Sequence, residues 1–280
     1  MSDLVAVDTA EIVNRIKSES TPDRHWIFDC DGTLITGDIA SHTAWWLIRS
    51  GLAHPEHLPG EWKMFKDAVF DYDTFHLLRK IIIEKRGLNG VYEWEVLLHS
   101  GLPQMTIKKL VGEVVDEGIQ QKSLVFTHPL SDLCQEMKEQ VWIVSGSPHD
   151  CVSTLVSRLG IPEHRVMGTL LDEVDGIYSP RISAPGIVWE KLKQTVLEGQ
   201  GIHNPWFVAG DSIGDWYMFD MASDWCWCVV WDEHRHRGEE FREIVQDRLL
   251  NSSGLTLPKA PGTYLHRIQN KNWVFEVKRP

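Results

Sequence analysis

The sequence predicts an α/β protein with a doubly wound, mostly parallel, Rossmann-like sheet and a helical cap domain inserted after the first strand. In the second half of the chain, short apolar runs alternate with helical patterns between residues 141 and 230. This βαβ rhythm is typical of a parallel sheet. Residues 37–122 show no convincing strand, and their apolar residues recur at helical spacing. We therefore expect an α/β core domain of residues 1–36 and 106–280 and a helical cap domain of residues 37–105.

The first elements follow from local signals. Asp8, with Glu11 three residues later, resembles a capping box and predicts a helix to about Lys17. A loop with Pro22 leads to the apolar run Trp26–Phe28, which is too short for a helix and fits a buried strand. In the insert, breaks are expected at 51–60, 87–90 and 100–103, and a helix at 106–118 leads back to the core.

The second half supplies the rest of the sheet. Strands are expected at Val141–Val144, Val166–Met167, Trp206–Ala209 and Trp225–Val230. Helices are expected at His149–Leu159, Gly186–Leu197 and Asp215–Met221, and a hairpin at Asp172–Arg181 around Asp175-Gly176. The tail, residues 232–280, predicts a helix at Glu239–Leu250, a loop at Asn251–Gly262 and a last strand at Trp273–Val277. Its role is not indicated by the sequence.

Composition narrows the class of protein. The net charge of −12 leaves no basic stripe to neutralise phosphates, which argues against a nucleic-acid partner. No apolar run approaches the ~18 residues of a membrane span, and the N-terminus lacks the pattern of a signal peptide. The five cysteines are expected to be reduced thiols. We therefore expect a cytoplasmic protein without a membrane partner, and the sequence does not indicate its oligomeric state.

Two aspartates, Asp29 and Asp31, directly follow the first predicted strand. In an extended chain residues i and i+2 point the same way, so both carboxylates should meet the same space. Two neighbouring anions repel, and a cation or a shared proton would relieve that repulsion. The alternative is a solvated polar turn.

Three predicted strands end in polar residues at one edge of the sheet, where doubly wound proteins bind ligands. These residues are Asp29 and Asp31, Ser145 and Ser147, and Asp211 and Asp215. A predicted helix before the last pair carries Lys191 and Lys193. The set combines carboxylates, hydroxyls and a lysine, and a divalent cation would relieve the repulsion among the carboxylates.

These residues also resemble a known family. Asp29-Cys-Asp-Gly-Thr-Leu34 resembles motif one of the haloacid dehalogenase superfamily, and Ser145, after an apolar strand, resembles motif two. A lysine on the helix before the last acidic cluster resembles motif three, and Gly210–Asp215 resembles motif four. Order and spacing match across about residues 25–231. The sequence is identified as a member of this superfamily, similar to its phosphoserine phosphatase-like subfamily.

The resemblance implies a role for each residue. Asp29 would be the nucleophile, and Asp31 the general acid and base. Mg²⁺ would be held by Asp29, the backbone carbonyl of Asp31 and Asp211, with Asp215 in an outer shell. The phosphoryl group would be bound by Ser145, Gly146, Lys191 and the backbone N–H groups of Gly32 and Thr33. Ile187 follows Gly186 where the family has its lysine, so spacing selects Lys191, with Lys193 as the alternative.

Two residues of the insert bear on the substrate. Asp38 stands where phosphoserine phosphatases carry a glutamate facing the substrate's ammonium, and Arg79 matches the cap arginine that holds the substrate's carboxylate. The alternatives are that Asp38 is the polar start of a helix and that Arg79 lies on a solvated helix face.

The resulting hypothesis is a Mg²⁺-dependent phosphatase that hydrolyses a small phosphorylated metabolite through an aspartyl-phosphate. One alternative is a phosphotransferase or phosphomutase. Another is a phosphatase for phosphorylcholine, because aromatic faces can hold a quaternary ammonium and the insert carries Trp45, Trp46, Trp62 and Trp94; packing in a helical core also explains those residues. An alternative of another class is a catalytically weak binding or regulatory module that kept the fold.

Overall fold

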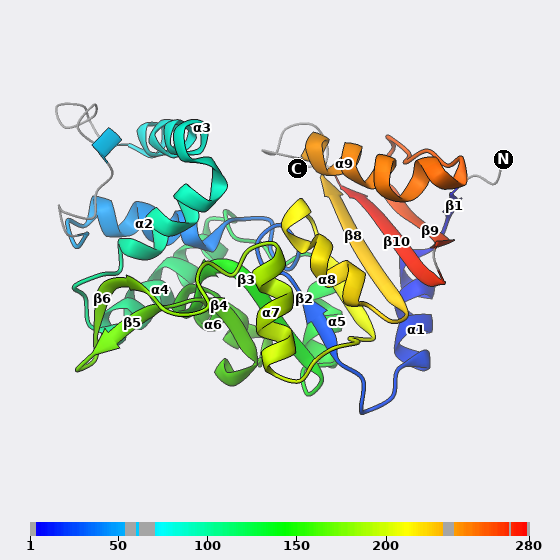
Figure 1. The fold of residues 1–280 in the computed structure, drawn as a ribbon, viewed down its shortest axis with the longest axis horizontal. Coiled ribbons are helices and arrows are strands. Elements are labelled where there is room, and N and C mark those ends of the chain that lie inside the picture. The colour runs from blue at the N-terminus through cyan, green and yellow to red at the C-terminus, as the bar shows by residue number, and fades with distance from the viewer. Residues whose placement is uncertain (1–3, 54–59, 62–70, 232–237, 269, 279–280) are drawn as a thin grey trace.

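The computed structural model describes residues 4–53, 60–61, 71–231, 238–268 and 270–278 of the 280-residue chain (Figure 1). Within these residues an eight-stranded sheet has the order β1-β9-β10-β8-β7-β2-β3-β4. The six strands from β10 to β4 run parallel, while β9 pairs antiparallel with both β10 and β1. The mostly parallel sheet is therefore confirmed. The strands are β1 Val5–Ala6, β2 Trp26–Phe28, β3 Val141–Pro148, β4 Val166–Thr169, β7 Phe207–Gly210, β8 Trp225–Trp231, β9 Gly262–Ile268 and β10 Lys271–Lys278.

Helices cover both faces of the sheet. They are α1 Thr9–Glu19, α2 Ile39–Arg49, α3 Tyr72–Leu97, α4 Gln104–Gln120, α5 Leu130–Glu136, α6 His149–Val156, α7 Lys191–Gly199, α8 Trp216–Met221 and α9 Gly238–Val245. Short 3₁₀ segments lie at Ser157–Leu159, Glu163–Arg165, Ile213–Asp215 and Asn251–Ser253, and α9 continues into a π-helical turn at Gln246–Leu250. A separate hairpin pairs β5 Leu171–Val174 with β6 Ile177–Ile182.

The side chains of β2 show the doubly wound arrangement, because they pack into separate hydrophobic clusters on the two faces of the sheet. Trp26 and Phe28 belong to one buried cluster, to which α1 to α6 contribute, while Ile27 belongs to a second cluster with α7 to α9. Successive residues of a strand point to opposite faces, so a strand that is apolar throughout is buried on both. All three residues are fully buried.

Several local predictions are confirmed. Asp8 caps α1 by accepting a hydrogen bond from the backbone N–H of Ala10 at 2.8 Å. The hairpin turns at Asp175 and Gly176, which both have positive φ values, 53° and 78°, as a two-residue hairpin turn requires. Gly160, also at positive φ, ends the helical segment that starts at His149. The five cysteines are buried and free of disulfides.

The insert is helical where the structure describes it. Helices α2 and α3 lie at one end of the molecule, and α9, β9 and β10 lie at the other (Figure 1). Helix α3 passes through a kink at Gly87, whose φ of 71° and ψ of −176° are not helical, and this matches the expected break. The predicted break at 51–60 lies largely outside the described residues. The boundaries of a cap domain stay a prediction.

Three differences from the prediction concern elements with weak local patterns. Strand β9 occupies a segment for which no strand was expected, and β1 and α5 were also missed. Strand β9 carries polar residues such as His266 and Arg267, so its apolar alternation is poor. Helix α7 begins at Lys191, although the pattern placed its start at Gly186.

Within the described part of the chain, no helix has the length and apolar character needed to cross a membrane.

Candidate active site

The site lies where parallel strands end. Strand β2 is paired on one side with β3 and on the other with β7, with Phe28 opposite Ile143 and Ala209. The backbone N–H of Asp29 continues this pairing by donating to the carbonyl of Ala209 at 2.9 Å. The residues that follow the three strands therefore emerge side by side.

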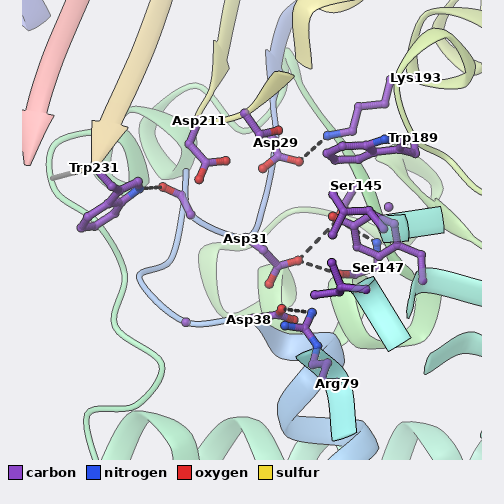
Figure 2. A pocket seen from close by; sticks show the side chains of 17 residues that line it. Asp29, Asp31, Asp38, Arg79, Ser145, Ser147, Trp189, Lys193, Asp211 and Trp231 are labelled. Carbon is purple, nitrogen blue, oxygen red and sulfur yellow. Dashed lines mark hydrogen bonds and ion pairs between the residues drawn. The ribbon is translucent and has the colours of Figure 1, made fainter. Parts of the chain in front are cut away.

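A pocket of about 290 Å³ opens at this edge (Figure 2). Eight of the predicted site residues line it, and they are Asp29, Asp31, Gly32, Asp38, Arg79, Ser145, Gly146 and Asp211. Thr33 and Asp215 are fully buried and are not among the lining residues. The solvated-turn alternative for the aspartate pair is wrong, because Asp29 is 5% exposed and Asp31 is half-buried.

The structure does not bring Lys191 to the pocket. Lys191 is the first residue of α7 and is exposed, whereas Lys193 is 1% exposed and lines the pocket. The segment before α7 is not helical, since Gly186 and Glu190 have φ values of 118° and 49°. The helix therefore starts five residues later than its apolar pattern suggested, and Lys193 is the residue that faces the site.

Lys193 is held between two carboxylates. Its Nζ donates to Oδ1 of Asp29 at 2.5 Å and to Oδ1 of Asp215 at 2.6 Å. Burial alone would lower the pKa of Lys193, but the two carboxylates outweigh it and raise the pKa above its ordinary value. Burial raises the pKa of Asp29 to about 7, against the opposing effect of Lys193. Lys193 therefore stays charged and reduces the repulsion around Asp29.

Asp215 organises the loop after β7. Its Oδ2 accepts hydrogen bonds from the backbone N–H groups of Asp211 and Ser212, at 3.1 and 3.0 Å, and from the Ser212 hydroxyl at 2.9 Å. Both oxygens of Asp215 are thus engaged, one by Lys193 and one by the loop. This arrangement fixes where the Asp211 side chain enters the pocket.

The acidic cluster suits a divalent cation. Carboxylate oxygens of Asp29, Asp211 and Asp215 all lie within 4.8 Å of one another, and one buried lysine balances only part of their charge. Oxygen ligands of this kind are those that Mg²⁺ prefers. Gly32 leaves space for the cluster, because a Cβ atom there would lie 1.9 Å from Oδ2 of Asp211. The hydroxyl of Thr33 donates to Oδ1 of Asp211 at 3.4 Å, which is a weak contact.

Asp31 is fixed through both carboxylate oxygens. Its Oδ1 accepts the backbone N–H of Ile39 at 2.8 Å. Its Oδ2 accepts the hydroxyl of Ser147 at 2.7 Å, with the Ser145 hydroxyl at 3.5 Å (Figure 2). Burial, followed by the nearby charge of Asp38, raises the pKa of Asp31 to about 7. A carboxyl group with such a pKa can both donate and accept a proton near neutral pH.

Asp38 and Arg79 contact each other at the wall of the pocket opposite Asp29 (Figure 2). Nη2 of Arg79 donates to Oδ2 of Asp38 at 2.7 Å, and Nε donates to Oε1 of Glu95 at 2.7 Å. Asp38 also begins α2, where its Oδ1 accepts the backbone N–H of Ser41 at 2.9 Å. Both residues predicted in the insert therefore line the pocket. Arg79 is also bonded to Glu95, a buried glutamate that the sequence did not single out.

Other pocket residues were missed or were given no role. Ser147 was expected at this edge of the sheet but was given no role, and its hydroxyl donates to Asp31. Tyr92, Trp189 and Trp231 line the pocket, and the indole N–H of Trp231 donates to the carbonyl of Gly32 at 2.8 Å. Tyr92 and Trp231 lie outside the four motifs, and no sequence signal links them to the site. Trp189 lies two residues before Lys191, close to motif three, but its residue type alone did not mark it as a site residue.

The tryptophans of the insert, which motivated the phosphorylcholine alternative, contribute to the core where the structure describes them. Trp45, Trp46 and Trp94 pack in or against the main core cluster, and they are not among the described residues that line the pocket. Trp62 lies outside the described residues.

Comparison with known proteins shows the family of this chain. A family model for haloacid dehalogenase-like hydrolases matches residues 26–220, which include all three strand ends of the site. The chain belongs to the haloacid dehalogenase-like hydrolases. The sequence resemblance to this family is thereby confirmed, and the match ends before β8, β9 and β10, so these strands lie outside it.

Two curated relatives and one solved structure are similar to this hydrolase. It is 26% identical over 161 residues to a putative hydrolase of Mycobacterium leprae (strain TN), covering 55% of the chain and 48% of the relative. It has the same identity to phosphoserine phosphatase SerB1 of Mycobacterium tuberculosis (strain H37Rv), covering 55% and 47%. The chain thus spans about half the length of the curated relatives it matches. A protein of unknown function from Bordetella pertussis Tohama I shares the fold, with a TM-score of 0.58, 17% identity, and coverage of 84% of this chain and 98% of that one.

Proposed function

We propose that this hydrolase is a Mg²⁺-dependent phosphatase that hydrolyses a small phosphomonoester through an aspartyl-phosphate on Asp29. The observation that carries the proposal is the position of the Asp29 carboxylate, which bonds Lys193 and lies within 4.8 Å of carboxylate oxygens of Asp211 and Asp215, in a pocket that also holds Asp31. One buried carboxylate is thus available as a nucleophile, and a second is available as a proton donor. Phosphoryl transfer requires this combination of positioning and charge stabilisation.

In this mechanism Asp29 attacks phosphorus, and Lys193 neutralises negative charge on the transferred group. Asp31 gives its proton to the leaving alcohol oxygen and later takes a proton from the water that hydrolyses the aspartyl-phosphate. The hydroxyl of Ser147 and the N–H of Ile39 hold the carboxyl group of Asp31 in place through both steps. The hydroxyl of Ser145, at 3.5 Å from Asp31, is available to a phosphoryl oxygen.

The carboxylates of Asp29 and Asp211, with the backbone carbonyl of Asp31, would hold Mg²⁺. The ion would supply positive charge against the phosphoryl oxygens. Asp215 would lie in the outer shell of this site and would not bind the ion directly, because both of its oxygens are already bonded, one to Lys193 and one to the loop after β7.

The test is phosphate release from p-nitrophenyl phosphate by the purified protein with Mg²⁺, with EDTA, and with Mg²⁺ restored. We expect turnover with Mg²⁺, loss with EDTA and recovery on restoration. Asp29→Asn should remove nearly all turnover, because a carboxamide is a poor nucleophile. Asp116→Asn, which changes the same residue type at an exposed position, should not. Turnover that survives both EDTA and Asp29→Asn would overturn the proposal.

The same assay decides between the alternatives. A phosphotransferase would transfer the phosphoryl group to an added alcohol in preference to water, so product other than free phosphate would identify it. A binding module would show no turnover at all. Phosphoserine is the specific substrate that the M. tuberculosis relative suggests, and it belongs in the first substrate panel.

A further inference from the structure

We propose that the alcohol released by this enzyme carries a positive charge and no carboxylate, so that the substrate is a phosphorylated amino alcohol rather than a phosphorylated amino acid. This inference rests on the function proposed above. It follows from the charges at the wall of the pocket formed by α2 and α3.

The leaving group must extend toward that wall. Asp31 gives a proton to the leaving oxygen, so the alcohol lies on the Asp31 side of the phosphoryl group, away from Asp29 and Lys193. On this side Asp38 and Arg79 line the pocket (Figure 2). The N–H of Ile39, the residue after Asp38, is itself bonded to Asp31 at 2.8 Å. The start of α2 therefore adjoins the group that protonates the leaving oxygen.

Arg79 is poorly suited to receive a substrate carboxylate, because two protein carboxylates already share its charge. Asp38 accepts from Nη2 and Glu95 accepts from Nε, both at 2.7 Å. Glu95 is 1% exposed, lies behind Arg79 and does not line the pocket. A substrate carboxylate would be a third anion around one guanidinium, close to Asp38 and Glu95, and like charges in such contact strongly disfavour binding.

When Glu95 is ionised, Asp38, Glu95 and Arg79 together carry one net negative charge, which a cation in the pocket would relieve. Asp38 keeps about a third of its side chain exposed, at 35%, and can accept from a ligand. Burial opposes ionisation of Asp38, but Arg79 and the N–H of Ser41 hold its pKa below the ordinary value. Arg79 and Lys193 are the cations among the described lining residues, and both are paired with carboxylates.

The rest of this wall is aromatic and apolar. Tyr92, Ile83 and Leu88 line the pocket beside Arg79. The ring of Tyr92 lies 5.1 Å from that of Trp189, centre to centre, so two aromatic rings adjoin each other at the pocket. A small ammonium group would meet Asp38 and an aromatic surface, both of which favour a cation.

The first test compares three substrates that share the phosphoryl group and differ in leaving-group charge. They are O-phosphoethanolamine, propyl phosphate and O-phosphoserine, with kcat/KM measured in Mg²⁺ at about pH 8. Burial raises the pKa of Glu95 to about 7, so this pH keeps Glu95 ionised. We expect O-phosphoethanolamine to exceed O-phosphoserine by at least about tenfold, with propyl phosphate between them.

Equal or better kcat/KM for O-phosphoserine would overturn the inference while leaving the phosphatase function intact. If no phosphomonoester, including p-nitrophenyl phosphate, is hydrolysed, the proposed function fails and this inference fails with it.

The second test uses Glu95→Gln, which keeps an oxygen acceptor for Arg79 but removes one negative charge. The ratio of kcat/KM for O-phosphoserine to that for O-phosphoethanolamine should rise by about tenfold. Glu84→Gln, at an exposed position of the same helix, is the matched control and should leave the ratio unchanged. Thermal unfolding establishes that each variant is folded.

If Glu95→Gln does not fold, Asp38→Asn serves the same purpose, because asparagine can still cap α2. It should also raise the ratio, chiefly by lowering kcat/KM for O-phosphoethanolamine. A ratio that stays at the wild-type value in the folded variant would contradict the inference.

Discussion

The two lysines of α7 provide a matched test of which one serves the site. Lys193 is buried and paired with Asp29 and Asp215 at 2.5 and 2.6 Å, whereas Lys191 is exposed. Replacing each with methionine removes the charge and keeps most of the side-chain length. Lys193→Met should abolish turnover and destabilise the fold, and Lys191→Met should do neither.

The magnitude follows from what Lys193→Met leaves behind, namely two buried carboxylates without their shared cation. Breaking a buried ion pair in this way costs about 3–5 kcal/mol. An exposed substitution such as Lys191→Met changes stability by no more than about 0.5 kcal/mol.

The loss should also depend on pH. Removing the ammonium raises the pKa of Asp29, already about 7 in the folded wild type, still further. The folded variant then binds more protons than the folded wild type near neutrality, so its relative stability increases as the pH falls. The destabilisation should therefore be larger at about pH 8 than at about pH 6.

The assay is urea unfolding in EDTA, so that no bound metal contributes, with the free energy of unfolding extrapolated to water. A loss below about 1 kcal/mol for Lys193→Met, or equal losses for the two variants, would refute the account of Lys193 as the buried cation of the site. So would a Lys191→Met variant with impaired turnover.

Three further predictions concern single residues around Asp29. Asp31→Asn should slow turnover by about 10²- to 10⁴-fold, and by more with propyl phosphate than with p-nitrophenyl phosphate, whose leaving group needs less protonation; equal losses would argue against Asp31 as the proton donor. Gly32→Ala places a Cβ atom on a backbone with φ of 87° and 1.9 Å from Oδ2 of Asp211. Because Asp211 is a proposed Mg²⁺ ligand, the variant should need a higher Mg²⁺ concentration for half-maximal rate. An unchanged Mg²⁺ requirement would contradict this. Trp231→Phe removes the 2.8 Å hydrogen bond to the Gly32 carbonyl and should lower the free energy of unfolding by about 1 kcal/mol as well as the rate; if urea unfolding matches wild type, this bond does not stabilise the loop.

The sequence predicted those parts of the site that short-range patterns determine. Asp29 and Asp31 follow a strand whose bounds, Trp26–Phe28, were predicted as the structure has them. Parallel strands then bring Ser145 and Asp211 to the same edge, and this follows from topology alone. The roles of these residues as nucleophile, acid and ligands stay predictions until activity is measured.

The remaining features depend on contacts that local patterns do not encode. Spacing ranked Lys191 above Lys193. The non-helical backbone before α7, with Glu190 at positive φ, shifts where the helix begins, and Lys193 is the lysine that lines the pocket. Ser147 binds Asp31, which lies 116 residues away in the sequence, and Glu95 binds Arg79, which lies 16 residues away. Strand β9 was missed because its polar residues weaken the alternation that marks a strand.

The measurement that tests the central claim most directly is the capture of a phosphoryl group on Asp29. The protein is mixed with radiolabelled phosphomonoester and Mg²⁺, quenched in acid during turnover, digested and analysed by mass spectrometry. The account predicts label on the peptide that contains Asp29, stable in acid and released by hydroxylamine, and no label in Asp29→Asn. Label on another residue, or turnover by Asp29→Asn at the wild-type rate, would contradict it.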